Sequence, residues 1–263
     1  MDLWAGLRAG GLLLRQAALI ASYAALAGWR VSPFLRWALQ WRNLTRAGGA
    51  ADRIGCFGPG PHVVWEATQR CNLRCAHCHA HAGARAGDDE LTTAEARELI
   101  RQVAESGTRT FVFSGGEPLL RRDLFDLLAY ARSLGLSLFL ATNGLLIDEG
   151  AARRLRELQV GVVIGLDAME PAIHDEIRGL QGAWELATRS VELCARMGLY
   201  FHLNVVATAA NLSEVDRVIA YGDRLGAYSH FVYRFVPMGR GTEVEELDLN
   251  PEEQAALCET LIA

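Results

Sequence analysis

From His62 onward, short runs rich in β-branched and aromatic residues alternate with amphipathic segments of helical periodicity. This alternation constrains the fold, because strands joined by helices pair in parallel and the helices cover the sheet. Six such units predict an α/β domain over residues 61–263, with a parallel sheet that curves into a barrel or partial barrel. The strands are expected near residues 62–68, 109–114, 136–141, 160–166, 199–206 and 229–236.

Helices are expected in the segments between these strands. Thr92 or Thr93 can cap the first of them, and Glu95 falls in its first turn, where an acid suits the helix dipole. The expected helices lie near residues 93–106, 122–134, 148–157, 183–197 and 212–225, and another runs from Pro251 to the end of the chain.

Residues 1–60 differ in character and are predicted to form a basic, Trp-rich helical extension followed by a linker. Up to Arg46 there are six Arg against one acid, Asp2, and four of the six Trp of the chain lie here. The extension either packs on its own domain or a partner, or lies on a membrane surface through residues 1–46. Its apolar runs are shorter than the roughly 20 residues that span a bilayer. A secretory signal would need an apolar stretch that Arg15 interrupts.

The charged residues exclude several classes of function. The chain has no Lys, so all 26 basic residues are Arg, and neither a Schiff-base lysine nor a P-loop lysine is available. The net charge of -5 is opposite in sign to that of a general nucleic-acid binder, so no nucleic-acid partner is expected.

The six cysteines are unevenly placed, since Cys71, Cys75 and Cys78 lie within eight residues directly after the first predicted strand. Three thiolates on one short loop can bind three irons of a [4Fe–4S] cluster and leave the fourth iron open. The alternative is a zinc site completed by a nearby histidine, although zinc ligands usually come as CxxC pairs from two separated places. Such clustering indicates a reducing compartment rather than a secreted disulfide scaffold.

Polar and glycine-rich motifs follow the next predicted strands. Ser114–Pro118 (SGGEP) closes the second strand; its glycines let the backbone approach a ligand, and its acid adds an acceptor for an ammonium group. Thr142–Gly144 closes the third, and Asp167 closes the fourth. The segment His174–Gly179 comes next, in which Arg178 can fork onto a carboxylate. Singly, each motif also fits an ordinary turn, helix cap or surface ion pair, but all fall at strand ends, where barrel chemistry sits.

In order and spacing, CxxxCxxC, GGEP and TNG resemble the motifs of the radical S-adenosylmethionine (SAM) superfamily, over about residues 62–240. The resemblance implies a (β/α)6 partial TIM barrel with an N-terminal helical extension, and an enzyme with one [4Fe–4S] cluster and SAM as cofactors. In such enzymes an electron enters the cluster, the sulfonium is cleaved, and a 5′-deoxyadenosyl radical removes a hydrogen atom from the substrate.

The resemblance also implies roles for single residues, but it assigns no catalytic side chain acting on the substrate. The amino and carboxylate groups of SAM are implied to bind the open iron. Relatives often have Ser at the position of Gly165, so this departure leaves the carboxylate site less defined. The implied cluster ligands are Cys71, Cys75 and Cys78, and the implied SAM contacts are Gly115, Gly116, Glu117 and Pro118 at the amino group, Arg178 at the carboxylate, Asn143 and Asp167 at the sugar or active-site end, and His77 near the adenine.

Within the superfamily, residues 65–80 (WEATQRCNLRCAHCHA) and Val236–Gly241 (VPMGRG) resemble one branch. It contains enzymes of haem, haem-d1, pyrroloquinoline-quinone and mycofactocin biosynthesis, and peptide maturases. That branch commonly adds a C-terminal domain with further Cys-ligated clusters. Here the chain stops at Ala263 inside a predicted helix and Cys258 is the one late cysteine, so such a domain is expected to be absent. The chain is then either a fragment or a member without auxiliary clusters.

The sequence is compatible with three functions for this protein. The first is a radical SAM enzyme acting on a small molecule, such as a tetrapyrrole, a lipid-like compound or a cofactor precursor. The second is a maturase of a ribosomally made peptide, ranked lower because residues 1–60 look helical rather than like a strand-rich leader-binding module. The third is a non-catalytic metal-binding module, which explains the thiols but not the later motifs.

The expected partners follow from the resemblance and from the N-terminal composition. The resemblance implies flavodoxin or ferredoxin as the electron donor. The expected location is the cytoplasm, at the inner face of the membrane if residues 1–46 bind it.

Overall fold

The computed structural model of the protein describes residues 62–87 and 89–262. The predicted extension and linker, with the predicted membrane contact through residues 1–46, lie outside the described residues, and so does Cys56. The domain boundary near residue 60 therefore stays a prediction. Among the described residues, no helix is both long enough and apolar enough to cross a bilayer.

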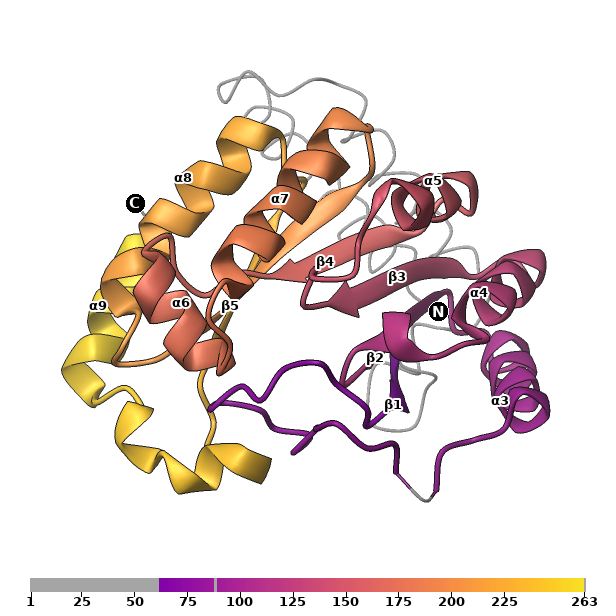
Figure 1. The fold of residues 1–263 in the computed structure, drawn as a ribbon, viewed down its shortest axis with the longest axis horizontal. Helices are drawn as coiled ribbons and strands as arrows, with labels where there is room; N and C mark the ends of the chain where they lie inside the picture. Colours follow the sequence, from indigo (N-terminus) through magenta and orange to yellow (C-terminus); the bar gives the residue numbers. More distant parts are fainter. Residues whose placement is uncertain (1–61, 88, 263) are drawn as a thin grey trace, which may run out of the picture. The chain divides into compact units, whose positions relative to one another are not determined.

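Six parallel strands form one sheet whose order follows the sequence, β1-β2-β3-β4-β5-β6 (Figure 1). The sheet is open rather than closed, which confirms the predicted α/β partial barrel. Because every neighbouring pair is parallel, the carboxyl ends of all strands lie at one edge. The strands are β1 His62–Thr68, β2 Thr110–Gly115, β3 Ser137–Thr142, β4 Gly161–Gly165, β5 Phe201–Ala207 and β6 His230–Arg234.

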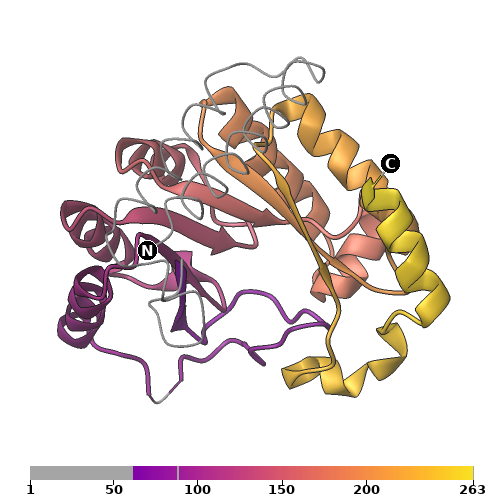
Figure 2. The ribbon, with the colours of Figure 1, turned by 180° about the vertical axis from the view of Figure 1, so that it is seen from behind.

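The helices follow the strands as the periodicity predicts, with one addition. Thr92 caps the first helix through a capping box with Glu95. The short helix α6 (Pro171–Arg178) was not predicted, because its eight residues are too few for a clear apolar period. The other helices are α3 Thr93–Glu105, α4 Leu124–Ser133, α5 Glu149–Glu157, α7 Ala183–Arg196, α8 Val215–Leu225 after a 3-10 turn at Leu212–Glu214, and α9 Pro251–Ile262 (Figure 2).

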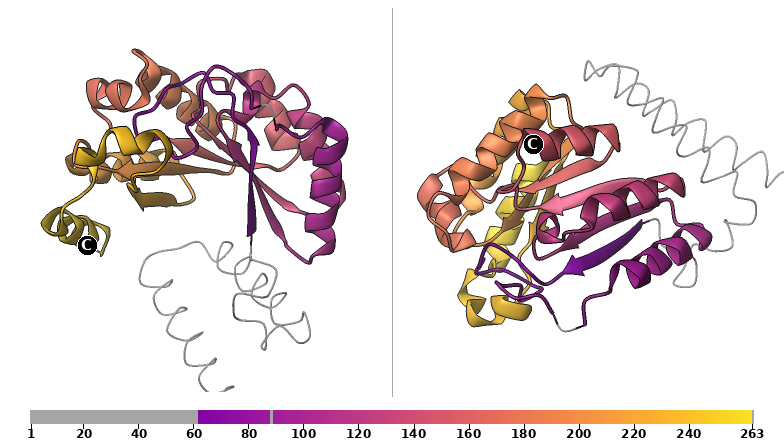
Figure 3. Two further views of the ribbon diagram at one scale, coloured as in Figure 1. Left: turned by 90° about the horizontal axis from the view of Figure 1, so that it is seen from below. Right: turned by 45° about the vertical axis from the view of Figure 1, so that its right-hand side comes forward.

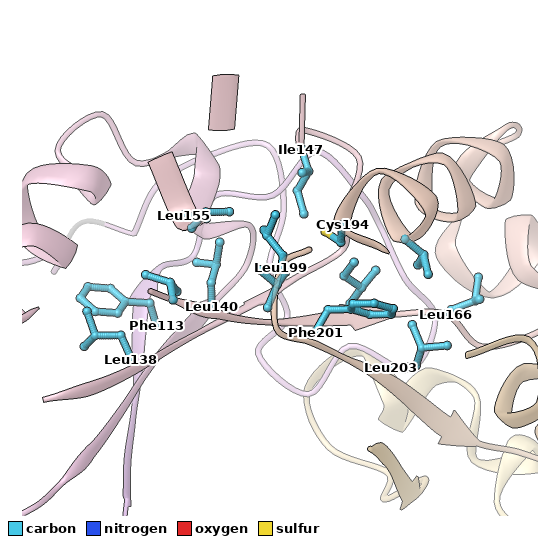
Figure 4. Packing of buried hydrophobic residues seen from close by; sticks show 14 of the residues in the cluster. Phe113, Leu138, Leu140, Ile147, Leu155, Leu166, Cys194, Leu199, Phe201 and Leu203 are labelled. Carbon is cyan, nitrogen blue, oxygen red and sulfur yellow. The ribbon is translucent and has the colours of Figure 1, made fainter. Parts of the chain in front are cut away.

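One face of the sheet carries the hydrophobic core. Figure 3 shows the sheet curving with helices along its outer side. Alternate strand residues such as Phe113, Leu140 and Phe201 point to this side and are buried against helix residues such as Leu155 and Cys194 (Figure 4). The core therefore fixes the strands from outside and leaves the strand ends for polar side chains.

The other face of the sheet holds a group of rings around His202. Its ring centroid lies 5.6 Å from that of Phe139 and 5.2 Å from that of Phe231. His202 Nδ1 lies 2.7 Å from the hydroxyl oxygen of Ser229, whereas Nε2 is buried and has no hydrogen-bond partner among residues 62–87 and 89–262. Burial, together with the nearby charge of His230, lowers the pKa of His202 to about 4.

We expect His202 to make stability depend on pH. Its pKa is about 4 in the folded chain against an ordinary value of 6.5, so between these values the unfolded chain binds the proton and the folded chain does not. The free energy of unfolding should then rise with pH across this window. In His202→Phe the rise should be shallower, measured by urea denaturation at several pH values. A loss of stability equal at every pH would report packing alone and contradict this expectation.

Candidate active site

The loop that follows β1 carries the three clustered cysteines, at the carboxyl edge of the sheet. Cys75 is buried, and Cys71 and Cys78 are half-buried. The N–H of Leu73 donates to Cys71 Sγ at 3.4 Å, and the N–H of Ala82 donates to Cys78 Sγ at the same distance. Because N–H donors favour a charged sulfur over a neutral one, both contacts would help to stabilise a thiolate once it forms.

The Gly-Gly pair of the second motif packs against the backbone that leaves β1. The N–H of Gly116 donates to the carbonyl oxygen of Thr68 at 2.7 Å, and the N–H of Glu117 donates to that of Arg70 at 2.8 Å. Gly115 has a φ of 124°. A Cβ atom at Gly115 would overlap the Thr68 carbonyl, and one at Gly116 would overlap that of Arg70. Both glycines are thus required by the close approach of two chain segments.

Glu117 joins the second motif to the third. Its carboxylate is fully buried and accepts bonds from the hydroxyl of Thr142 at 2.9 Å and from the N–H of Asn143 at 2.9 Å. Burial raises the pKa of Glu117 to about 7, against the opposing effect of these bonds. The amide of Asn143 donates in turn to Asn72 Oδ1 at 2.7 Å and lies 3.9 Å from Cys71 Sγ. The structure therefore brings these predicted residues together beside the cysteine loop.

Asp167 is the centre of a second buried group, at the end of β4. One carboxylate oxygen, Oδ2, lies 2.9 Å from His77 Nε2 and 2.7 Å from Arg178 Nε, although that N–H is not aligned for a hydrogen bond. The other oxygen accepts the N–H of Val206 at 3.1 Å. Burial alone would raise the pKa of Asp167, but the charge of Arg178, with a contribution from His77, holds it well below its ordinary value. Asp167 is therefore ionised, and it fixes His77 and Arg178.

Gly165 makes room for the Arg178 side chain. A Cβ atom at Gly165 would lie 2.5 Å from Arg178 Nη2 and 3.0 Å from Nη1, closer than real Cβ contacts. A serine at this position would displace the guanidinium from where it lies here, so the glycine suits this placement of Arg178.

The unpredicted helix α6 supports the cysteine loop through its last turn. The N–H of Ala76 donates to the carbonyl oxygen of Ile177 at 2.8 Å. The carboxylate of Asp175 accepts the N–H groups of Gly182 at 2.6 Å and Trp184 at 2.8 Å, which fixes the start of α7. His174 accepts the N–H of Asp167 through Nδ1 at 3.1 Å. The segment thus positions its neighbours through its backbone as well as through Arg178.

Sequence reasoning missed several polar residues behind the site. The amide of Asn211 donates to the carbonyl oxygens of Asp167 at 2.8 Å and Val206 at 3.0 Å, so it ties the end of β5 to that of β4. The carboxylate of Glu214 accepts the N–H groups of Met169 and Glu170. Their position in the sequence could have indicated them, because both residues follow the end of a predicted strand.

A zinc site was the alternative to an iron–sulfur cluster that the sequence left open for the cysteine loop. In the described part of the chain, no three His, Cys, Asp or Glu side chains converge on a point where they could hold a single metal ion.

Residues 65–221 match the Radical SAM superfamily. The chain belongs to this superfamily. It is 36% identical over 192 residues to an AdoMet-dependent heme synthase of Oleidesulfovibrio alaskensis, covering 73% of this chain and 50% of the relative. It is 34% identical over 204 residues to a mycofactocin maturase of Mycobacterium ulcerans, covering 76% of this chain and 54% of the relative.

A solved structure shows the same fold. SuiB of Streptococcus suis bound to S-adenosylmethionine aligns with a TM-score of 0.67 at 17% identity, covering 76% of this chain and 46% of that one. The chain thus spans about half the length of the curated relatives it matches. Family membership makes it an enzyme and implies a [4Fe–4S] cluster and SAM, and the relatives lie in the predicted branch.

Asp167→Asn should be strongly destabilising, because it leaves the Arg178 guanidinium buried without its counter-charge. We expect a loss of about 3–5 kcal/mol in the free energy of unfolding of the metal-free protein, measured by urea denaturation. The matched control is Asp248→Asn, which removes the partner of Arg234 from a surface ion pair of 2.8 Å and should change stability little. Equal losses in the two variants would contradict the proposed dependence on burial.

Proposed function

We propose that this chain binds one [4Fe–4S] cluster through Cys71, Cys75 and Cys78 and cleaves SAM reductively, to oxidise or rearrange a small-molecule substrate. The observation that carries the proposal is that the loop bearing the three cysteines meets the GGEP, TNG and Arg178 segments at one edge of the sheet. With a cluster held by Cys71, Cys75 and Cys78 and SAM beside it, the site would supply radical chemistry that removes a hydrogen atom from the substrate.

The surroundings of the sulfurs fit a cluster. Two of them already accept backbone N–H bonds, a kind of contact that also tunes cluster potentials. Burial raises the pKa of Cys71 to about 11 and also raises that of Cys75, where Arg178 acts in the opposite direction. Both side chains are therefore protonated before the cluster binds, and ligation has to release their protons. Cluster assembly should accordingly be favoured at higher pH.

We propose that the segment Gly115–Pro118 receives the amino group of SAM. Its backbone is held against β1, and its carbonyl groups can accept bonds from an ammonium group. The carboxylate of Glu117 is already bonded to Thr142 and Asn143, so it would act on the ammonium group through its negative charge rather than through a direct hydrogen bond. Pro118 begins the 3-10 turn and stiffens the exit of the motif.

The remaining SAM contacts are proposed around Asp167. Arg178 is held by Asp167 and is a permanent cation suited to the SAM carboxylate. Asp167 and Asn143 are proposed at the sugar end. His77, whose ring is fixed by Asp167, is proposed to lie beside the adenine.

A small-molecule substrate, in particular a tetrapyrrole, is supported by the AdoMet-dependent heme synthase among the relatives. Peptide maturation is the second candidate, because a mycofactocin maturase is nearly as similar. A flavodoxin or ferredoxin is proposed as the electron donor. The protein is proposed to work in the cytoplasm, with contact to the inner face of the membrane through residues 1–46.

The proposal predicts an EPR-active cluster that cleaves SAM. After anaerobic reconstitution with iron and sulfide, the dithionite-reduced protein should show a [4Fe–4S]+ signal, and SAM should yield 5′-deoxyadenosine, measured by chromatography. Cys75→Ala should lose the signal and the product. The matched control Cys258→Ala removes an exposed thiol of α9 and should keep both. Iron bound without any release of 5′-deoxyadenosine would contradict the function.

The same assay can rank the substrates. An iron porphyrin that carries propionate groups should increase the rate of 5′-deoxyadenosine release above the rate without substrate. An increase only with added peptides would favour the maturase.

A further inference from the structure

The segment after β6 contacts the cysteine loop, although the function proposed above gives it no role. It contains the VPMGRG sequence and forms a 3-10 turn at Gly239–Glu243. The N–H of Arg240 donates to the carbonyl oxygen of Cys78 at 3.0 Å. Gly239 has a φ of 56°, and a Cβ atom there would overlap the carbonyls of Cys78 and His79. Figures 1 and 2 show this segment next to the loop that leaves β1.

The Arg240 side chain is buried against the same loop. It is 5% exposed, and Nη1 donates to the carbonyl oxygen of Cys75 at 2.8 Å. Nη2 donates to the carbonyl of Ala82, so the guanidinium holds the loop on both sides of Cys78. Its Nε–H is buried and has no hydrogen-bond partner among the described residues.

The charge of Arg240 has no counter-charge in the described part of the chain. None of the ion pairs there includes it, and the hydrogen-bond partners of its side chain are neutral backbone carbonyl groups. By contrast, the well-buried guanidinium of Arg178 pairs with Asp167, and that of Arg121 pairs with Asp123. A buried charge without a partner is costly, so the fold keeps a cation here for which the described residues supply no anion.

We propose that the missing counter-charge is the iron–sulfur cluster, and that Arg240 is a positioning residue that both clamps the cluster loop and favours cluster reduction. This rests on the proposed function, since it requires a cluster on Cys71, Cys75 and Cys78. A cluster with three thiolates is an anion, and reduction adds one negative charge. A fixed cation nearby stabilises the reduced form more than the oxidised form and so raises the reduction potential.

The test is a redox titration monitored by EPR on reconstituted wild-type protein and on Arg240→Met, which removes the charge. At a fixed potential, the ratio of reduced to oxidised cluster should fall roughly tenfold in Arg240→Met, which is about 59 mV for a one-electron couple. Arg240→Lys keeps the charge but not the paired donors. It should titrate close to wild type, even if it binds less iron.

The matched control is Arg121→Met. Arg121 also donates to two backbone carbonyls, those of Ala67 and Leu91 at 2.8 Å each, but its charge is paired with Asp123. This variant should leave the potential of the cluster unchanged.

Each outcome decides one question. An unchanged potential in Arg240→Met would overturn the proposal, and so would an equal shift in Arg121→Met. If Arg240→Met does not retain the cluster, the cluster potential of Arg240→Gln is compared with that of Arg240→Lys. Equal potentials in these two variants would overturn the charge effect. An equal loss of iron in the Met, Gln and Lys variants would also overturn it, because Arg240 would then act only by holding the loop. A wild-type protein without a [4Fe–4S]+ signal would instead refute the proposed function.

Discussion

The structure of the site depends on how the polar backbone of the cysteine loop is satisfied. The loop forms no helix or strand of its own, so its N–H and carbonyl groups need partners elsewhere. They find them in the GGEP turn, at the end of α6 and in the Arg240 guanidinium. These segments are far apart in sequence and meet because all strands of the sheet run in parallel and end at one edge.

Two buried carboxylates organise this edge in opposite electrostatic ways. Asp167 faces cations, so it stays ionised and fixes Arg178 and His77. Glu117 faces neutral donors, and burial brings its pKa close to neutrality. One carboxylate therefore balances a positive charge that the fold must bury. The other joins two strand ends through hydrogen bonds and carries a charge that the surroundings only partly compensate.

Much of this could be predicted from the sequence, because the information was local. The alternation of short apolar runs with amphipathic segments placed six strands within one or two residues of their observed bounds. The spacing of Cys71, Cys75 and Cys78 marked the loop without any tertiary information. Helix α6 was missed because a short helix has little periodicity.

The contacts that shape the site were not predictable, because they join distant positions. Arg240 lies 165 residues after Cys75, and nothing local to either residue indicates that they touch. Gly165 was noticed only as a departure from relatives. Its contact with the guanidinium of Arg178 exists only in the folded chain.

The absence of lysine from the chain has a consequence for the site. Arg178 and Arg240, the two cations that the described residues bury around the cysteine loop, are guanidinium groups, which keep their proton throughout the physiological pH range. The positive charge that these two side chains supply is therefore constant across the physiological range. The buried carboxylate of Glu117, with a pKa of about 7, does change its charge there, so a change in cellular pH would act on the site through this acid rather than through the cations.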